Sequence, residues 1–384
     1  MRVIIYQPNS FGGYYDYAIR SFKALKREPG VTDVLLVLPT DAEYNDRGVK
    51  KIFLPDKPIS KNSLIRRSYF LFRSFADPYL FFFRILISTN NTLILFNCFE
   101  QLSSPFWCWL FRLFKRKNQF GIYLHDPERD YVTPNRWYSR FSMSVLMKMM
   151  DFAFYHSFLP AKKYYSIDPG KIMFVDVPHG IYSLPPAGSV LKEELRSARG
   201  NYKIMTLLGS IRRDKNYEIA IRLLALMPDY KLFIAGRSTS SSYPSGQLKD
   251  LAKRTGVADR VIWVERFLSE DEMAAVIEES DIFLLLYSAG FVSQSGVLNI
   301  IAGFKKPFVY SDFPSALSIL SKRFGLYKGV DLNNIENIPK VINEILNEKD
   351  KYNTAWDEYL TYASWDENAR IIVDSVASKN SIIL

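Results

Sequence analysis

The chain has 384 residues, which is too long for one ordinary hydrophobic core and suits two domains of roughly 150 to 200 residues each. Its 48% hydrophobic and 23% charged residues exclude an intrinsically disordered protein. Two cysteines, Cys98 and Cys108, exclude a disulfide framework and a four-cysteine metal site, and they favour a reducing compartment.

The first half of the chain alternates short apolar runs with helix-length segments. Continuous apolar runs of this kind are typical of strands that are buried on both faces of a parallel sheet. The predicted strands are residues 3–6, 34–38, 92–96, 120–124 and 152–155. No apolar run reaches the ~18 residues of a membrane span, so we expect that the chain does not cross a bilayer.

Two features follow strands of the first half. Gly12 and Gly13 come after the first strand, where a glycine pair lets the backbone approach a ligand closely before a helix begins near Tyr14; a simple tight turn is the alternative. His125 follows the strand at 120–124, where an imidazole can donate to a sugar hydroxyl or a phosphate, although a structural histidine fits the position equally well. His156 and His179 also follow strands and are weaker candidates for a ligand contact.

The second half repeats the alternation, with predicted strands at 204–208, 232–235, 261–264, 281–286 and 307–310. Five parallel strands fit a second Rossmann-like sheet. A segment rich in proline and glycine, residues 178–189, predicts a linker and a domain boundary near residue 190. We therefore expect domains at 1–190 and 191–363, followed by a closing helix at 364–384 that starts with Ser364 and Glu367 as a capping box.

The second domain opens with the sequence GSIRRDKN, a loop between a strand and a helix. Gly209 frees the end of the strand, and Arg212, Arg213 and Lys215 supply positive charge. Asn216 or Asp214 is expected to cap the helix that runs from about Tyr217 to Met227. Cations beside a helix N-terminus suit a diphosphate; a solvated charged loop is the alternative.

A second loop follows the strand at 281–286. Ser293, Ser295 and Gly296 precede a short apolar helix, so their hydroxyl and backbone N–H groups are candidates for the other side of the same phosphates. The two loops follow neighbouring strands, and we expect them to form one site.

The order of these pieces resembles retaining glycosyltransferases of the GT-B fold, specifically glycosyltransferase family 4, over nearly the whole chain. The resemblance implies two Rossmann-like domains that face a central cleft, with a C-terminal helix that returns to the N-terminal domain. It implies that Arg213 and Lys215 hold the diphosphate of a nucleotide sugar, that Gly12 and Gly13 face the cleft, and that His125 approaches the transferred sugar. It also implies retention at the anomeric carbon, no cofactor and no essential metal.

One departure from the family is visible. Many members carry two glutamates, seven residues apart, that contact the sugar and the ribose, whereas residues 288–306 contain no carboxylate here. The sequence SQSGVLN resembles a subset of the family in which Ser295 and Gly296 take part in diphosphate binding. Asp126, Glu128 and Asp130 form an acidic cluster, a weak alternative that would bind a metal.

The segment 61–118 is rich in cations and aromatic side chains. From Lys57 to Lys117 there are ten Lys or Arg residues, two carboxylates and fifteen aromatic residues. This composition suits an anionic membrane surface. The alternatives are a buried aromatic core with a solvated basic rim, and single-stranded nucleic acid, which no motif supports.

The function that these observations favour is transfer of a sugar from a nucleoside-diphosphate sugar to a glycan or lipid-linked saccharide, in a cytoplasmic protein bound peripherally to the membrane. The alternatives are a GT-B-like partner subunit without activity and a nucleotide-sugar epimerase. A dinucleotide-dependent oxidoreductase is disfavoured because no G-x-G-x-x-G follows the first strand.

Overall fold

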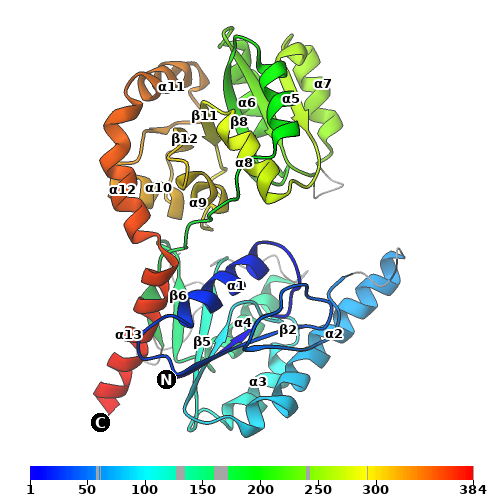
Figure 1. Ribbon diagram of the computed structural model, residues 1–384. Helices are drawn as coiled ribbons and strands as arrows, with labels where there is room; N and C mark the ends of the chain where they lie inside the picture. The colour runs from blue at the N-terminus through cyan, green and yellow to red at the C-terminus, as the bar shows by residue number, and fades with distance from the viewer. Residues whose placement is uncertain are drawn as a thin grey trace. The chain divides into compact units, whose positions relative to one another are not determined.

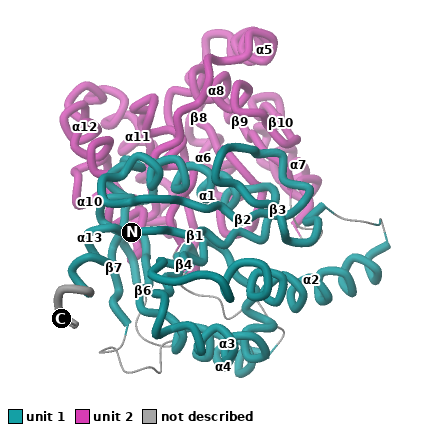
Figure 2. Tube along the Cα trace, turned by 60° about the horizontal axis from the view of Figure 1, so that its bottom comes forward, with its two compact units in different colours: residues 1–180, 364–384 teal, residues 181–363 magenta. Residues whose placement is uncertain are grey.

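The computed structural model describes residues 1–57, 60, 62–126, 135–159, 172–238, 243–291 and 293–383, with side chains up to residue 379. The chain divides into two compact units (Figure 2). The first comprises Met1–Gly180 together with Ser364–Leu384, and the second comprises Ile181–Ala363.

The first unit is built on a seven-stranded sheet in the order β3-β2-β1-β4-β5-β6-β7, and its strand pairs are parallel. All five strands that the sequence predicts for this unit are confirmed; β3 and β7 were not predicted. The strands are β1 (Arg2–Tyr6), β2 (Asp33–Pro39), β3 (Val49–Phe53), β4 (Thr92–Phe96), β5 (Gln119–Leu124), β6 (Phe152–Tyr155) and β7 (Met173–Asp176).

Helices cover both faces of this sheet (Figure 1). Along β1, Ile4 and Tyr6 join the core under one set of helices, while Val3 and Ile5 join the core under the other, because successive side chains of a strand point to opposite faces. The first set is α2 (Ser63–Arg84), α3 (Ser104–Arg112) and α4 (Arg136–Met147), and the second is α1 (Gly13–Leu25) and α13 (Trp365–Ile383).

The second unit has a six-stranded parallel sheet in the order β10-β9-β8-β11-β12-β13. Again the five predicted strands are confirmed, and the two-residue β13 was missed. The strands are β8 (Lys203–Leu208), β9 (Tyr230–Ala235), β10 (Val261–Val264), β11 (Ile282–Leu285), β12 (Phe308–Ser311) and β13 (Gly329–Val330).

The helices of the second unit connect and flank these strands. They are α5 (Ser189–Arg199), α6 (Tyr217–Ala225), α7 (Ser245–Arg254), α8 (Glu270–Glu278), α9 (Gly296–Ala302), α10 (Ala316–Phe324), α11 (Ile338–Asn347) and α12 (Asn353–Tyr362). Short 3-10 turns occur at Leu86–Ser88, Arg213–Lys215, Ala258–Arg260, Ile335–Asn337 and Lys349–Tyr352. No helix in the described part of the chain has both the length and the apolar character needed to span a bilayer.

The expected domain boundary near residue 190 differs from the observed division, which falls between Gly180 and Ile181. The proline-rich segment is held by the second unit, because the Ile181 N–H donates to the Ala363 carbonyl at 2.9 Å and the Tyr182 N–H donates to the Asn299 carbonyl at 3.1 Å. A segment that looks like a linker in the sequence is therefore part of a folded unit.

The strand order positions the functional groups. In each sheet the chain runs outward from one central strand and then resumes on its other side, so β1 and β4 flank one switch point and β8 and β11 flank the other. Open parallel sheets bind ligands outside the carboxyl ends of the strands at such switch points.

Candidate functional site

Two glycines bring the ends of β8 and β9 into contact at the switch point of the second unit. Gly209 has φ +93° and Gly236 has φ +144°, both in the region that favours glycine. A Cβ added to Gly236 would lie 2.2 Å from the Gly209 carbonyl oxygen. The predicted role of Gly209 at the strand exit thus depends on a second glycine, Gly236.

Lys215 lies beneath this strand exit. Its side chain is 6% exposed, and its Nζ donates to the Leu208 carbonyl at 2.7 Å. The pKa of Lys215 is lowered to about 7, mainly by burial and in addition by the nearby Arg212, while Asp214 acts in the opposite direction. This lysine is therefore a buried amine whose charge responds to its surroundings near neutral pH.

Arg212 and Arg213 are exposed on the same loop. The Arg212 guanidinium pairs with the Asp214 carboxylate at 3.1 Å and lies 5.8 Å from the ring centroid of Phe291. The guanidinium of Arg213 lies 5.9 Å from the ring centroid of Tyr243. Cation–π contacts of this kind hold the two guanidinium groups over neighbouring loops while leaving them accessible to solvent.

The two candidate loops lie together, as their neighbouring strands predict. The Ser288 N–H donates to the Asp214 carbonyl at 2.8 Å, and the Asn216 side-chain amide donates to the Leu286 carbonyl at 2.8 Å. Asn216 occupies the N-cap position of α6, but its side chain makes no cap hydrogen bond. The expectation is therefore wrong for Asn216, whose backbone is left-handed, with φ 51°, rather than extended as in a capping residue. Its amide instead connects the loop to the end of β11.

The second loop is arranged differently from the sequence-based expectation. Ser295 is fully buried, its Oγ lies 2.8 Å from the Tyr287 hydroxyl, and it accepts the Leu298 N–H as the cap of α9. A ligand would therefore meet the loop backbone and Gly296, where an added Cβ would have nothing within 4 Å, rather than the Ser295 hydroxyl. Ser293 precedes them and is half-buried.

In the first unit, Gly12 and Gly13 form an open turn at the start of α1. Gly12 is the N-cap residue with φ +84°, and an added Cβ would meet nothing within 4 Å at either glycine. The turn and the close-approach interpretations both fit this geometry, since the left-handed φ requires glycine and the space above it is open.

His125 belongs to a hydrogen-bonded chain at the carboxyl ends of the first sheet. Its Nε2 lies 3.2 Å from Asn97 Oδ1, and its Nδ1 lies 3.2 Å from His156 Nε2. His156 Nδ1 in turn lies 2.9 Å from the Val177 carbonyl oxygen. The sequence analysis did not select Asn97. It directly follows β4, so the rule that places ligand-binding residues after strands would have identified it.

The hydrogen-bond acceptors at the two ends of this row of side chains determine which ring nitrogens carry protons. Asn97 Nδ2 donates to the Tyr14 carbonyl at 2.8 Å and to Gln7 Oε1 at 2.6 Å, which orients its Oδ1 toward His125. The Val177 carbonyl at the other end is also an acceptor. Three hydrogen bonds between two acceptors therefore require three protons on two imidazole rings, and the histidine pair carries one positive charge when all three are made.

The surroundings of the two rings differ. Burial lowers the pKa of His156 to about 4, so that ring stays neutral. The ring of Tyr14 stacks on His125 with centroids 5.0 Å apart, and its hydroxyl donates to the Asp126 carboxylate. Both ring nitrogens of His125 have protein partners, so a direct bond to a transferred sugar would have to replace the bond to Asn97.

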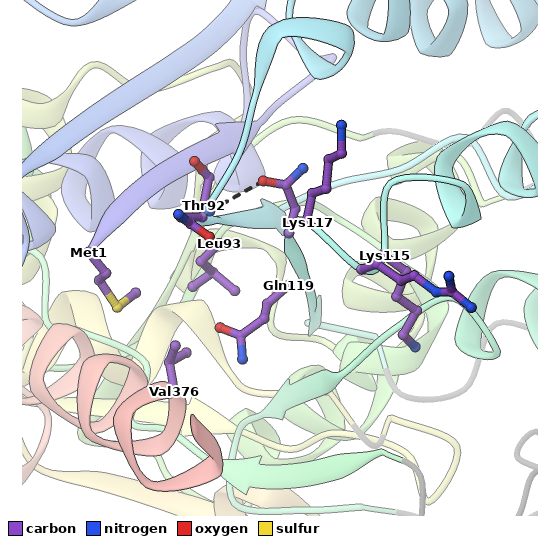
Figure 3. A pocket seen from close by; sticks show the side chains of 10 residues that line it. Met1, Thr92, Leu93, Lys115, Lys117, Gln119 and Val376 are labelled. Carbon is purple, nitrogen blue, oxygen red and sulfur yellow. Dashed lines mark hydrogen bonds between the residues drawn. The ribbon is translucent and has the colours of Figure 1, made fainter. Parts of the chain in front are cut away.

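Within the described residues, the remaining candidates add no further site. In the described residues, no group of three or more His, Cys, Asp or Glu side chains is placed to hold a metal, and Glu128 and Asp130 of the acidic cluster lie outside those residues. A pocket of about 430 Å³ lies between Thr92, Leu93, Gln119 and Val376 (Figure 3). It opens at the amino ends of β4 and β5, the edge opposite to the one where such sheets bind ligands.

Comparisons with known proteins bear on the family and the fold. Residues 192–361 match the family model of glycosyl transferases group 1, and the matched segment lies within the second unit. A search of curated protein sequences finds no significant match.

Several solved structures are similar along almost the whole chain. Alpha,alpha-trehalose 6-phosphate synthase from Burkholderia multivorans has a TM-score of 0.71 at 13% identity, covering 100% of this chain and 98% of that chain. HepE from Anabaena, in complex with UDP and glucose, has a TM-score of 0.62 at 14% identity, covering 99% of each chain. The lipopolysaccharide outer core galactosyltransferase WaaB has a TM-score of 0.63 at 14% identity, covering 99% of this chain and 100% of that chain. The two α/β units are therefore those of the GT-B fold.

Proposed function

We propose that this protein is a glycosyltransferase that uses a nucleoside-diphosphate sugar as donor. The observation that carries the proposal is the placement of Arg212, Arg213 and the buried Lys215 at the β8/β11 switch point, inside the segment that matches the glycosyl transferases group 1 family. The similarity to HepE with bound UDP and glucose supports a nucleotide-sugar donor.

The proposed chemistry is stabilisation of the leaving group. As the bond between the sugar and the diphosphate breaks, negative charge grows on the nucleoside diphosphate, and positioned cations are the groups that stabilise it. Arg213 and Lys215 would meet this charge, with the loop at Gly296 on the other side. We further propose retention at the anomeric carbon and a reaction without an essential metal.

The proposed acceptor is a glycan or lipid-linked saccharide in the synthesis of a cell-surface polysaccharide or glycoconjugate. The basic and aromatic segment at 61–118 supports this acceptor class, because its composition suits the surface where lipid-linked saccharides reside. The corresponding location is the cytoplasmic face of a membrane.

A GT-B-like partner subunit without activity is the second candidate. It is favoured by the lack of any carboxylate in residues 288–306, which leaves ribose recognition without an acidic group from this segment. A nucleotide-sugar epimerase is a third candidate, for which His125 and its chain would have to supply acid and base.

The test starts with a thermal-shift screen of UDP-, GDP- and other nucleotide sugars, because a ligand that binds the native state raises the melting temperature. Turnover is then measured as release of the nucleoside diphosphate with saccharide acceptors. Replacing Lys215 by Met, which keeps the length of the side chain, should lower turnover by about 10² to 10³, the typical effect of losing one positioned charge-stabilising group.

Lys249 provides the matched control. It lies on the surface of the same unit with its side chain 44% exposed, and Lys249→Met should leave turnover unchanged. Turnover by Lys215→Met at the wild-type rate would contradict the proposed role. Isomerised nucleotide sugar without release of the diphosphate would identify an epimerase, and binding without either product would identify a partner subunit.

A further inference from the structure

The first half of α2 has no buried residue. The buried side chains of this helix begin at Arg73, whereas apolar side chains before it are exposed: Leu64 by 71%, Phe70 by 60% and Phe72 by 62%. Figures 1 and 2 both show this end of α2 extending beyond the other helices of the first unit. A helix that presents large apolar side chains without covering a core is expected to meet a partner.

The exposed apolar surface continues on α3. Phe106 and Trp109 of α3 are 52% and 57% exposed, and Leu113, which directly follows the helix, is 67% exposed. The rings of Phe75 in α2 and Phe106 in α3 are 5.2 Å apart, so the two helices form one surface. The exposed side chains of α2 and α3 therefore belong to a single region rather than to scattered sites.

Helix α4, which lies outside the segment that the sequence singled out, extends the same region. Trp137 is 68% exposed and stacks on Phe141 with ring centroids 5.5 Å apart. The Tyr138 hydroxyl donates to the Leu102 carbonyl at 2.7 Å and joins the start of α4 to the segment before α3. We call the exposed side of α2, α3 and α4 the apolar-basic face.

The charges on this face have one sign. Asp77 is the sole acidic residue within α2, α3 and α4, and it is fully buried. The exposed cations of the three helices are Arg66, Arg67, Arg84, Arg112, Arg136 and Arg140. Aromatic side chains interleaved with cations and without carboxylates match the interface of an anionic bilayer, where apolar side chains enter the headgroup region and arginines contact phosphates.

We propose that the apolar-basic face docks this protein on an anionic lipid bilayer, with the first half of α2 inserted at the headgroup level. The inference deepens the proposed function, on which it rests only for the identity of the acceptor. The proposed membrane-binding surface is smaller than the predicted segment 61–118. Phe81, Phe82 and Trp107 of that segment are buried in the core of the first unit and do not reach the face.

The experiment is co-sedimentation of the full chain with two kinds of vesicle. One is made of phosphatidylcholine alone, and in the other phosphatidylglycerol replaces about a quarter of the phosphatidylcholine. We expect binding to the anionic vesicles at low salt and at least tenfold weaker binding to the neutral ones. Replacing both Phe70 and Phe72 by Ser should weaken anionic binding at least tenfold, and Arg66→Glu with Arg67→Glu should do the same.

Phe267→Ser is the matched control, because this phenylalanine is 79% exposed on the second unit and should not affect binding. All variants should keep the melting temperature and the thermal shift with nucleotide sugar, which separates a failure of docking from a failure of the proposed function. No binding of the wild type to anionic vesicles would overturn the proposal. So would a dimer in solution that Phe70→Ser with Phe72→Ser converts to a monomer, since the face would then serve a second copy of the chain.

Discussion

Donor binding should take up a proton on Lys215. In the unbound protein this side chain is 6% exposed, and its burial lowers the pKa to about 7. A diphosphate placed beside Nζ favours the charged form of the lysine and raises the pKa again. The protein should therefore bind its donor more tightly at pH 6, where the amine is already charged, than at pH 8.

The size of the effect follows from the pKa. With a value of about 7, roughly 0.9 of the Lys215 side chains are neutral at pH 8 and about 0.1 at pH 6. If the bound diphosphate restores the ordinary lysine pKa, binding takes up about 0.9 protons at pH 8 and about 0.1 at pH 6. The apparent affinity should then fall by about tenfold between these two pH values.

Isothermal titration calorimetry in buffers of different ionisation enthalpy measures this uptake. An intact nucleotide sugar is the suitable ligand, because its diphosphate is esterified at both ends and does not titrate in this range. Lys215→Arg keeps the charge at all these pH values and should show no uptake and no fall in affinity. Tight binding to the wild type at pH 8 with the same proton uptake as Lys215→Arg would refute the reasoning.

Two further predictions concern the neighbourhoods of the two switch points. Gly236→Ala should lower the free energy of unfolding in urea by about 1–3 kcal/mol, because the new Cβ would lie 2.2 Å from the Gly209 carbonyl oxygen and the φ of +144° is strained for alanine. Gly246→Ala is the control, because a Cβ added there meets nothing within 4 Å. An equal loss of stability in both variants would contradict the argument. Nitrogen-15 NMR at pH 7 should find three protons on the rings of His125 and His156, one of them between the two rings, as the three hydrogen bonds require. His156→Phe should remove the proton between the rings, and two neutral rings in the wild type would show that the arrangement is wrong.

Much of the fold could be predicted because burial leaves a local pattern in the sequence. The strands that lie in the middle of each sheet are continuous apolar runs, and they were found within a residue or two. The missed strands lack this pattern: β3 contains Lys50 and Lys51, β7 ends in Asp176, and β13 has two residues. These three are edge strands, which need fewer apolar side chains because one side of each has no neighbouring strand. The fourth edge strand, β10, was predicted because its sequence VIWV is a continuous apolar run.

The candidate site was predictable only in part. The loop with Arg213 and Lys215 is contiguous in sequence, and its glycine, cations and helix start are enough to suggest an anion site. The direction of the Ser295 hydroxyl was not predictable, because it depends on Tyr287 from the preceding strand end. The link from Asn216 to β11 likewise depends on a neighbour seventy residues away in the chain.

The sequence by itself determined the two parallel α/β sheets, the switch-point loops and the basic aromatic composition of residues 61–118, because each of these depends on residues close together in the chain. The tertiary structure alone decided how distant residues meet. It joined Asn97, His125 and His156 into one hydrogen-bonded chain, since β4, β5 and β6 are adjacent in the sheet. It also separated Trp107, which is buried, from Trp109, which is exposed two residues later, because a helix turns by about 100° per residue and only one side of α3 packs on the sheet.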